Sequence, residues 1–202
     1  MRKLTETKIV LASHNKGKLR EIQLLLMPYE IKCLSAGELG IDEPDETENT
    51  FAGNARIKAH CAAKASGLPA LSDDSGISID ALNGKPGVYT ADWAETKDGR
   101  DFNIAMQRVW RLLEEEGAPS PRFAQFNCTL CLAWPDGHDE IFAGIAPGQV
   151  VWPTRGEHGF GFDPMFQPEG YLKTFAEMLP AEKHPLTHRA DAFAKLVAGC
   201  LE

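Results

Sequence analysis

The stretch Ala70-Leu71-Ser72-Asp73-Asp74-Ser75-Gly76-Ile77-Ser78-Ile79-Asp80 places two adjacent carboxylates where an apolar run meets a Ser-Gly pair typical of turns. Two neighbouring Asp side chains repel each other and resist losing water, so they are best tolerated where a cation, a substrate group or solvent compensates their charge. The stretch therefore has two interpretations. It is either a site that requires a cation, or a solvated turn between two strands in which Asp73 and Ser75 bond to local backbone.

The composition of the chain predicts a single compact domain over residues 1–202. Its 202 residues are 43% apolar and 25% charged, which supplies enough apolar side chain for a sizeable core. No apolar run reaches the roughly 18 residues of a membrane span, and residues 1–7 do not resemble a secretion signal, so we expect a cytoplasmic protein. The formal net charge of −8 argues against nonspecific binding to nucleic acid or to an anionic membrane. An anionic ligand therefore needs a local cluster of Lys and Arg.

The five cysteines are an odd and scattered set, which predicts reduced thiols in a reducing compartment. Only Cys128 and Cys131 resemble a metal-binding pair. They lie in segment 122–134, which has the composition of a strand and should point the two thiols to opposite faces of a sheet. No second Cys pair supplies the other half of a zinc site, so we interpret both thiols as core residues.

The first polar loop, Ser13 to Lys18, lies between a strand and a helix. Residues 8–12 form a short apolar β-type run, and apolar residues from Leu19 to Leu26 recur at helical spacing. Such a loop is a natural anion cradle, because unpaired N–H groups and the positive end of the helix dipole face it. Lys16 and Lys18 add two cations. The spacing of a Walker A loop is absent, and the alternative is an ordinary loop with solvated lysines.

An acidic run, residues 40–50, directly precedes the next helix. By itself such a run is usually a solvated loop. Thr50 or Asn49 can cap the helix that follows, which carries Lys58 and ends at Gly67. A lysine-bearing helix therefore begins directly after a set of carboxylates.

Hydrophobic periodicity predicts the remaining elements. Apolar residues from Phe102 to Leu113 recur at helical spacing and predict an amphipathic helix that closes at Gly117. The other expected elements are a strand at 31–35, a strand or its edge at 77–82, a hairpin of 122–134 and 140–144 around the turn 135–137, a strand at 149–152, a short helical turn at 175–179, and a last helix over 190–200 that Thr187 can cap.

Two late segments gather groups suited to a flat polar ligand. Residues 155–166 combine glycines, aromatic rings and Asp163, which precedes a proline. Glycines let the backbone pass close to a flat ligand and an exposed Phe offers a stacking face, whereas a buried aromatic loop that plugs one end of the sheet is the equal alternative. Lys183, His188 and Arg189 gather cations and donors near the start of the last helix.

Five motifs in this order are together very specific, although each alone would be weak. They are Ser13-His14-Asn15-Lys16-Gly17-Lys18; Glu46-Thr47-Glu48-Asn49-Thr50-Phe51 with Asn54-Ala55 and Lys58; Asp73-Asp74-Ser75-Gly76; Gly159-Phe160-Gly161-Phe162-Asp163-Pro164; and Lys183 with Thr187-His188-Arg189. Over nearly the whole chain they resemble the inosine/xanthosine triphosphate pyrophosphatase family, hydrolases that remove noncanonical purine nucleoside triphosphates.

The resemblance implies a fold, a reaction and an assembly. The fold is α/β, with a long, twisted mixed β-sheet flanked by helices and two lobes with a central cleft. The reaction is hydrolysis of dITP, ITP, XTP or dXTP to the nucleoside monophosphate and pyrophosphate, which cleanses the nucleotide pool. The implied cofactor is Mg²⁺, and the implied assembly is a homodimer.

The resemblance also implies roles for individual residues. Asp74 is the catalytic carboxylate and Asp73 a supporting charge, while Asp74 together with Glu46 or Asp45 holds the metal. Many members carry two glutamates where this chain has Asp45-Glu46. The first loop and Lys58 hold the triphosphate, and the late segments contact base and sugar. The residues implied to bind substrate are Ser13, His14, Asn15, Lys16, Gly17, Lys18, Lys58, Ser75, Phe160, Gly161, Phe162, Asp163, Lys183, His188 and Arg189.

The chemistry of these residue types fits the implied reaction. A magnesium nucleoside triphosphate needs lysines on its phosphates, carboxylates on the metal and a base that orients water, and we expect all three on loops. Donors such as Lys183, aimed at a 6-oxo group, would reject adenine, because an amino group there leaves buried donors unpaired. One rival is a nucleotide pyrophosphatase for modified pyrimidine or canonical triphosphates. The other is a noncatalytic nucleotide-binding module, against which the acidic pair argues, since carboxylates without a metal repel phosphates.

Overall fold

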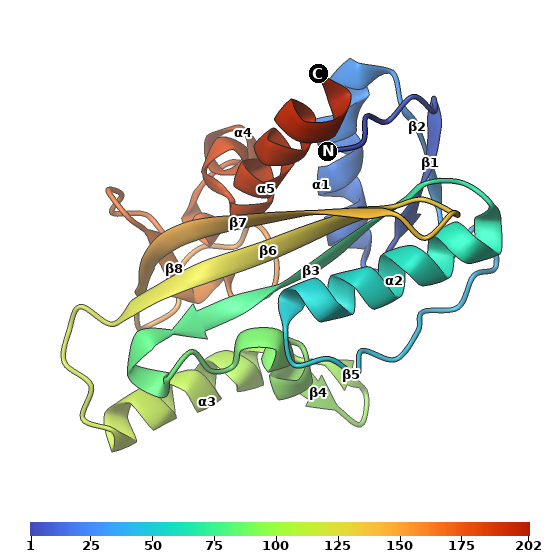
Figure 1. Ribbon diagram of the computed structural model, residues 1–202. Coiled ribbons are helices and arrows are strands. Elements are labelled where there is room, and N and C mark those ends of the chain that lie inside the picture. Colours follow the sequence, from blue (N-terminus) through green and yellow to red (C-terminus); the bar gives the residue numbers. More distant parts are fainter. The chain divides into compact units, whose positions relative to one another are not determined.

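The computed structural model describes residues 1–202 and has a mixed α/β fold (Figure 1). Its main sheet has six strands in the order β2-β1-β3-β6-β7-β8. β1 pairs in parallel with β2 and β3, whereas β7 and β8 are antiparallel, so the sheet is mixed as predicted. The strands are β1 (Lys8–Ala12), β2 (Lys32–Ser35), β3 (Ala70–Ile79), β6 (Phe123–Ala133), β7 (Asp139–Val150) and β8 (Phe166–Pro168), and β4 (Glu95–Thr96) pairs with β5 (Gly99–Arg100) in a separate ribbon. The helices are α1 (Lys16–Leu26), α2 (Phe51–Ser66), α3 (Phe102–Glu115), α4 (Pro180–Lys183) and α5 (His188–Leu196).

The chain divides into two compact units, each with an apolar core of its own. The first unit comprises Met1–Asp74, Cys128–Gly144 and Arg189–Glu202, and the second comprises Ser75–Asn127 and Ile145–His188. Two units agree with the two lobes that the resemblance implies, while the cleft and the single domain stay predictions. None of the helices combines the length and the apolar character that a membrane span requires.

Strands of the first unit carry helices on both faces. α1 and α5 lie on one side of them and α2 on the other (Figure 1). On the α1 and α5 side, Leu11 of β1 joins a cluster that contains Ile22 and Phe193. On the α2 side, alanines of α2 such as Ala59 pack against Val10 of β1. Small side chains let this helix approach the strands closely, which brings the longer Lys58 on the same helix near the sheet.

Cys128 and Cys131 occupy opposite faces of β6, as their spacing predicts. Cys128 belongs to the cluster under α1 and α5, whereas Cys131 belongs to the cluster under α2. Both thiols are buried, and all five cysteines are free. Burial raises the pKa of Cys131 to about 12, so this thiol is inert at neutral pH.

The core of the second unit forms around α3. Met106 and Leu113 of this amphipathic helix are buried in one cluster with Ile77 and Ile79, which lie at the end of β3. Phe126 of β6 belongs to the same cluster and stacks on further aromatic rings. The predicted amphipathic helix is therefore confirmed, with its apolar face in the core.

Caps fix the helix boundaries where the sequence predicts them. The side chain of Thr50 accepts a hydrogen bond from the backbone N–H of Gly53 and so starts α2. Gly67, with a φ of 67°, ends the same helix in the left-handed conformation. Asp101 caps α3 in the same way through the N–H of Asn103.

The predicted turn at Ser75-Gly76 is wrong, because β3 runs without interruption from Ala70 to Ile79. Gly76 serves close approach rather than a turn. A Cβ at this position would lie 2.3 Å from the carbonyl oxygen of Gly87 and 2.4 Å from Oγ1 of Thr90. Asp73 and Asp74 therefore sit in the middle of a buried strand, and the interpretation as a solvated turn is overturned.

The separate strands predicted at 140–144 and 149–152 are also corrected, since β7 is one continuous strand, Asp139–Val150. The Pro147-Gly148 pair, between the two predicted strands, lies where β7 meets the short strand β8. Gly148 pairs with Pro168, and a Cβ on Gly148 would lie 2.4 Å from the carbonyl oxygen of Gln167. The glycine again permits close packing of two strands rather than a turn.

Candidate active site

Asp73 and Asp74 project to opposite faces of β3, because successive side chains of a strand alternate. Asp73 lies on the α1 and α5 side, where Cys128 is its neighbour, and Asp74 lies on the side of α2. The parallel register that pairs Ala12 with Ser72 brings the end of β1, and hence the first loop, next to Asp73. The two carboxylates are thus separated, and each receives its own lysine.

Asp73 is enclosed by three donors. Nζ of Lys18 lies 2.6 Å from its Oδ1, and Nε of Arg189 lies 2.7 Å from its Oδ2. The thiol of Cys128 approaches the same Oδ2 at 3.2 Å. Burial alone would raise the pKa of Asp73, but the charges of Arg189 and Lys18 outweigh it and hold the pKa well below its usual range. Asp73 is therefore ionised at neutral pH and paired with two cations.

The resemblance implies that Arg189 contacts the base, which stays a prediction, and the structure places its side chain in the Asp73 network. Its side chain is 2% exposed, and it pairs with Asp73 and with Glu21 of α1. A buried guanidinium requires carboxylate partners, and here two of them are present. Burial alone would lower the pKa of Arg189, but the Asp73 carboxylate raises it. Glu21 was not among the predicted site residues. Its position one turn after Lys18, on the same face of α1, is the signal that points to it.

Asp74 shares an ammonium group with Glu46. Nζ of Lys58 lies 3.0 Å from Oδ1 of Asp74 and 2.5 Å from Oε1 of Glu46. The second oxygen of Asp74, Oδ2, is buried and has no hydrogen-bond partner. Burial raises the pKa of Asp74 more than the ammonium of Lys58 lowers it. Burial lowers the pKa of Lys58, but Asp74 and Glu46 more than reverse this and raise it, so the lysine is charged.

The donor set around Asp74 fits a magnesium ion that also binds phosphate oxygens. Asp74 and Glu46 converge on one cation, and no third His, Cys, Asp or Glu completes a three-ligand group. Mg²⁺ is commonly held by one or two carboxylates, with waters and substrate phosphates in the remaining positions. The orphaned Oδ2 of Asp74 is a further oxygen that needs a partner. Asp45 is exposed and takes no part in this convergence.

The first loop caps its own helix. The side chain of Asn15 accepts hydrogen bonds from the N–H groups of Gly17 and Lys18, so these donors are not the unpaired cradle that the sequence predicts. Ser13 is buried and accepts from the N–H of Asn15. Lys16 remains exposed. Its ammonium is therefore accessible to an anion, whereas that of Lys18 is paired with Asp73.

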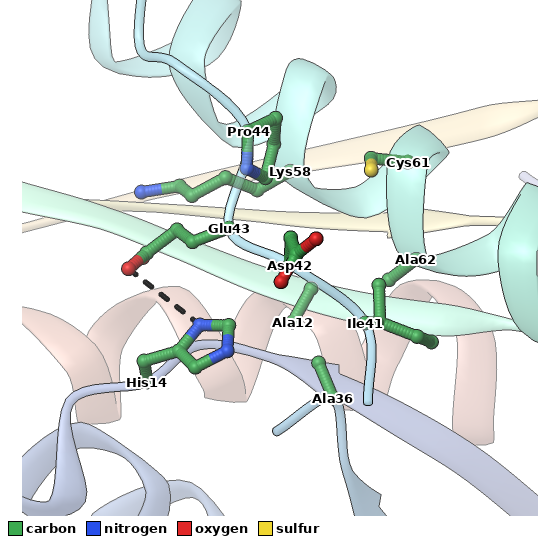
Figure 2. A pocket seen from close by; sticks show the side chains of 10 residues that line it. All are labelled: Ala12, His14, Ala36, Ile41, Asp42, Glu43, Pro44, Lys58, Cys61 and Ala62. Atoms are coloured by element: carbon green, nitrogen blue, oxygen red, sulfur yellow. Dashed lines mark ion pairs between the residues drawn. The ribbon is translucent and has the colours of Figure 1, made fainter. Parts of the chain in front are cut away.

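A small cavity with a volume of about 10 Å³ lies beside Lys58, with room for about one water molecule (Figure 2). Part of the acidic run, including Glu43, lines it together with Ala12 of β1. Nδ1 of His14 lies 3.5 Å from Oε2 of Glu43. This contact joins the acidic run to the first loop. The acidic run is thus held over the end of β1 at this point rather than being wholly solvated.

In the second unit, Asp163 is the anchor of the aromatic loop. Its Oδ2 accepts hydrogen bonds from Nζ of Lys183, at 2.7 Å, and from the N–H of Phe160, at 2.8 Å. Gly159 makes this turn possible, because its φ is 79° and a Cβ would lie 2.0 Å from Oδ2 of Asp163. Lys183 also lies 5.4 Å from the ring centroid of Phe160. Asp163, Lys183 and Phe160 therefore form one assembled group.

The two phenylalanines of this loop have different environments. Phe160 is 40% exposed, so it offers a face on which a flat ligand can stack. Phe162 is 1% exposed and packs edge-on against Phe102 of α3. Contact of Phe162 with substrate stays a prediction, and its side chain lies in the core of the second unit. Gly161, between them, has a φ of 66°.

Two further predicted substrate contacts are His188 and Ser75, whose binding roles stay predictions. His188 stacks on Phe126, with ring centroids 4.9 Å apart and an interplanar angle of 15°. Ser75 is half-buried on β3, directly after Asp74. The prediction that the catalytic groups lie on loops is wrong for Asp74, which lies on a strand, while Lys58 lies on the helix predicted to carry it.

Fold and site together define a mixed α/β protein in which a lysine and two carboxylates converge at a position suited to a metal-bound polyphosphate. The model of the Ham1 family matches residues 9–199. The chain is 64% identical to the dITP/XTP pyrophosphatase of Ruegeria pomeroyi, over 95% of this chain and 94% of that protein. It is 58% identical to the dITP/XTP pyrophosphatase of Agrobacterium fabrum over the full length of both.

Solved structures agree with the sequence comparisons. A HAM1 protein from Coxiella burnetii matches with a TM-score of 0.87 and 39% identity, over 95% of this chain and 97% of that one. The dITP/XTP pyrophosphatase from Mycobacterium abscessus matches with a TM-score of 0.74 and 34% identity, over 94% and 98%. This chain belongs to the Ham1 family.

Proposed function

We propose that this protein is a dITP/XTP pyrophosphatase, which hydrolyses noncanonical purine nucleoside triphosphates to the nucleoside monophosphate and pyrophosphate. The observation that carries the proposal is the convergence of Asp74, Glu46 and Lys58, present in a chain that matches dITP/XTP pyrophosphatases over its full length. Carboxylates for a metal and a lysine for phosphate are the groups that hydrolysis of a phosphoanhydride requires.

Glu46 and Asp74 are the residues that would hold Mg²⁺. Both already contact one cation, the Lys58 ammonium, whereas the side chain of Asp45 makes no ion pair with it. When bound, Mg²⁺ neutralises phosphate charge and polarises the reacting group. The two carboxylates position it, and their small number leaves room for phosphate oxygens.

The chain's own residues bind the phosphates and activate water. Asp74 orients the attacking water and accepts its proton, and the raised pKa that burial gives this carboxylate makes it a better base than an exposed Asp. Lys16, Lys18 and Lys58 supply positive charge for the triphosphate. Asp73 does not touch the substrate in this proposal and instead holds Lys18 in position.

The second unit supplies the groups for the base. Phe160 stacks on the purine, and Asp163 fixes the ammonium of Lys183 beside that ring as a donor for a 6-oxo group. His188, held by its stack on Phe126, is a further donor of this set. Adenine is rejected because its amino group would leave a buried donor unpaired.

Two further properties are part of the proposal. The protein acts as a homodimer, which light scattering checks: the expected mass is twice the chain mass of 22.2 kDa, and the mass of a single chain contradicts it. The protein functions in the cytoplasm, which the five free thiols support.

A nucleotide panel tests the proposed activity. Pyrophosphate release is measured in Mg²⁺ with dITP, ITP, XTP and dXTP. The controls are the canonical triphosphates, dATP among them, and modified pyrimidine triphosphates. We expect release from the 6-oxo purine substrates and its loss in excess EDTA. Equal release from dATP would refute the base assignment, and binding of dITP without turnover would refute the enzyme.

A further inference from the structure

Lys58 occupies the position in which the proposed function places a metal ion. Its ammonium touches Glu46 at 2.5 Å and Asp74 at 3.0 Å, and the residue is only 4% exposed. α2 holds it there, because the alanines around it on the helix pack tightly against the sheet. The two carboxylates are therefore neutralised by the chain itself before any metal arrives.

The same two carboxylates are too few to hold Mg²⁺ in competition with this ammonium. Mg²⁺ takes six oxygen ligands and gives up its waters reluctantly. The chain offers no third carboxylate, Cys or His in the cluster. A free ion would have to separate a buried ion pair and would gain only two protein ligands in return.

A triphosphate changes this balance. It brings oxygen ligands for the metal and, at the same time, an anion that can take over the ammonium of Lys58. The lysine side chain is long enough to turn from the carboxylates to a phosphate without a movement of α2. The new ion pair between the Lys58 ammonium and the phosphates then compensates for the loss of its pairing with Asp74 and Glu46.

Resting on the proposed function, we propose that Lys58 is a placeholder for the metal: it excludes free Mg²⁺ from the nucleotide-free protein, so that metal and triphosphate enter together. Lys58 pairs with Glu46 and Asp74 in the resting protein and transfers to the phosphates when the metal nucleotide binds. This role differs from simple phosphate binding, because it makes removal of the lysine charge strengthen metal binding when no nucleotide is present.

The test is binding of Mn²⁺ alone, as a probe for Mg²⁺, to the nucleotide-free protein, followed by electron paramagnetic resonance. The variants are Lys58→Met and, as a matched control, Lys64→Met, which removes an exposed lysine from the same helix. We expect Lys58→Met to bind Mn²⁺ about tenfold or more tightly than the wild type, as expected for removal of a charge at contact distance. Lys64→Met should behave as the wild type. Equal affinity of the wild type and Lys58→Met would overturn the proposal.

The wild-type protein provides a second readout that does not depend on the folding of a variant. Millimolar Mg²⁺ alone should leave its melting temperature unchanged, because a ligand that does not bind the native state does not stabilise it. If Mg²⁺ alone raises the melting temperature of the wild type by several degrees, and Asp74→Asn shows no such increase, the placeholder role is overturned. If that increase occurs while dITP is still hydrolysed, only this inference fails. If no nucleotide yields pyrophosphate, the proposed function itself fails.

Discussion

Asp73 and Asp74 are neighbours in the sequence, yet the protein treats them in opposite ways. Asp73 is surrounded by Lys18, Arg189 and Cys128, and its ionised form is stabilised. Asp74 shares one lysine with Glu46, keeps an oxygen without a partner, and has its ionised form disfavoured by burial. One step along a strand separates a carboxylate that holds the fold from a carboxylate that is available for chemistry.

The contrast between the two acids is one of charge satisfaction and not of residue type, since both are aspartates on the same buried strand. Removal of one partner of a fully paired buried carboxylate is strongly destabilising, and such a carboxylate has no capacity left for substrate. A carboxylate with an unsatisfied oxygen costs stability and offers a binding position. The predictions below either break this contrast or sharpen it.

Asp74→Asn should have the largest effect on activity. The amide keeps the shape but can neither accept a proton from water nor hold a metal as a carboxylate does, so turnover of dITP should fall about a thousandfold or more. The measurement is kcat for pyrophosphate release with saturating Mg²⁺. Turnover within a few-fold of the wild type would remove Asp74 from the reaction.

Arg189→Met should have the largest effect on stability. The variant removes the guanidinium that pairs with both Asp73 and Glu21, so the free energy of unfolding should fall by about 3–5 kcal/mol. Urea denaturation measures this. Arg111→Met, which removes an exposed arginine from α3, is the matched control and should change the free energy by less than about 0.5 kcal/mol. A stable Arg189→Met with reduced affinity for the purine would instead return Arg189 to the base contacts.

Lys18→Ala tests whether this lysine serves both the Asp73 network and the triphosphate. Loss of its charge should raise KM for dITP about tenfold, which corresponds to roughly 1.4 kcal/mol. The fall in stability should be smaller than in Arg189→Met, since the guanidinium still neutralises Asp73. Steady-state kinetics and urea denaturation of the same preparation give both numbers. An unchanged KM would confine Lys18 to the structure.

Asp73 and Asp74 should make opposite contributions to the pH dependence of the free energy of unfolding. These are the smallest of the predicted effects. The pKa of Asp73 is depressed in the folded protein, so its contribution is fully present above the ordinary Asp pKa of about 4 and is lost as pH falls below it. The pKa of Asp74 is raised in the folded protein. Its ionised form therefore destabilises the folded state at pH values above this raised pKa, and protonation removes that destabilisation as pH falls. The stability difference between wild type and Asp73→Asn should therefore narrow below about pH 4. A difference that is constant from pH 7 to 3 would contradict the network.

Much of the fold follows from local pattern. The helices α1, α2 and α3 and the strands β1, β2 and β6 lie where periodicity predicts them, because each combines an apolar period with a recognisable cap or turn. The exceptions, at Gly76 and Gly148, share one cause. Glycine beside Ser or Pro is typical of a turn, but here it accommodates a backbone or side chain that arrives from a distant part of the chain.

The candidate site was predictable in its residue types but not in their partners. The motifs assign Lys58 to the triphosphate and Asp74, with Glu46 or Asp45, to the metal, and the structure brings Lys58, Glu46 and Asp74 together. The pairing of Asp73 with Arg189 joins positions 116 residues apart, and no local pattern encodes such a contact. The contrast between Phe160 and Phe162 depends equally on which face of the loop meets the core.

The free energies of unfolding of Asp73→Asn and Asp74→Asn, measured by urea denaturation at pH 7, test the central contrast most directly. Asp73→Asn should lose about 3–5 kcal/mol, because it leaves Lys18 and Arg189 facing a neutral group. Asp74→Asn should be as stable as the wild type or more stable, because burial already disfavours the charge that it removes. Two variants destabilised to the same extent would contradict the division of roles between the two carboxylates.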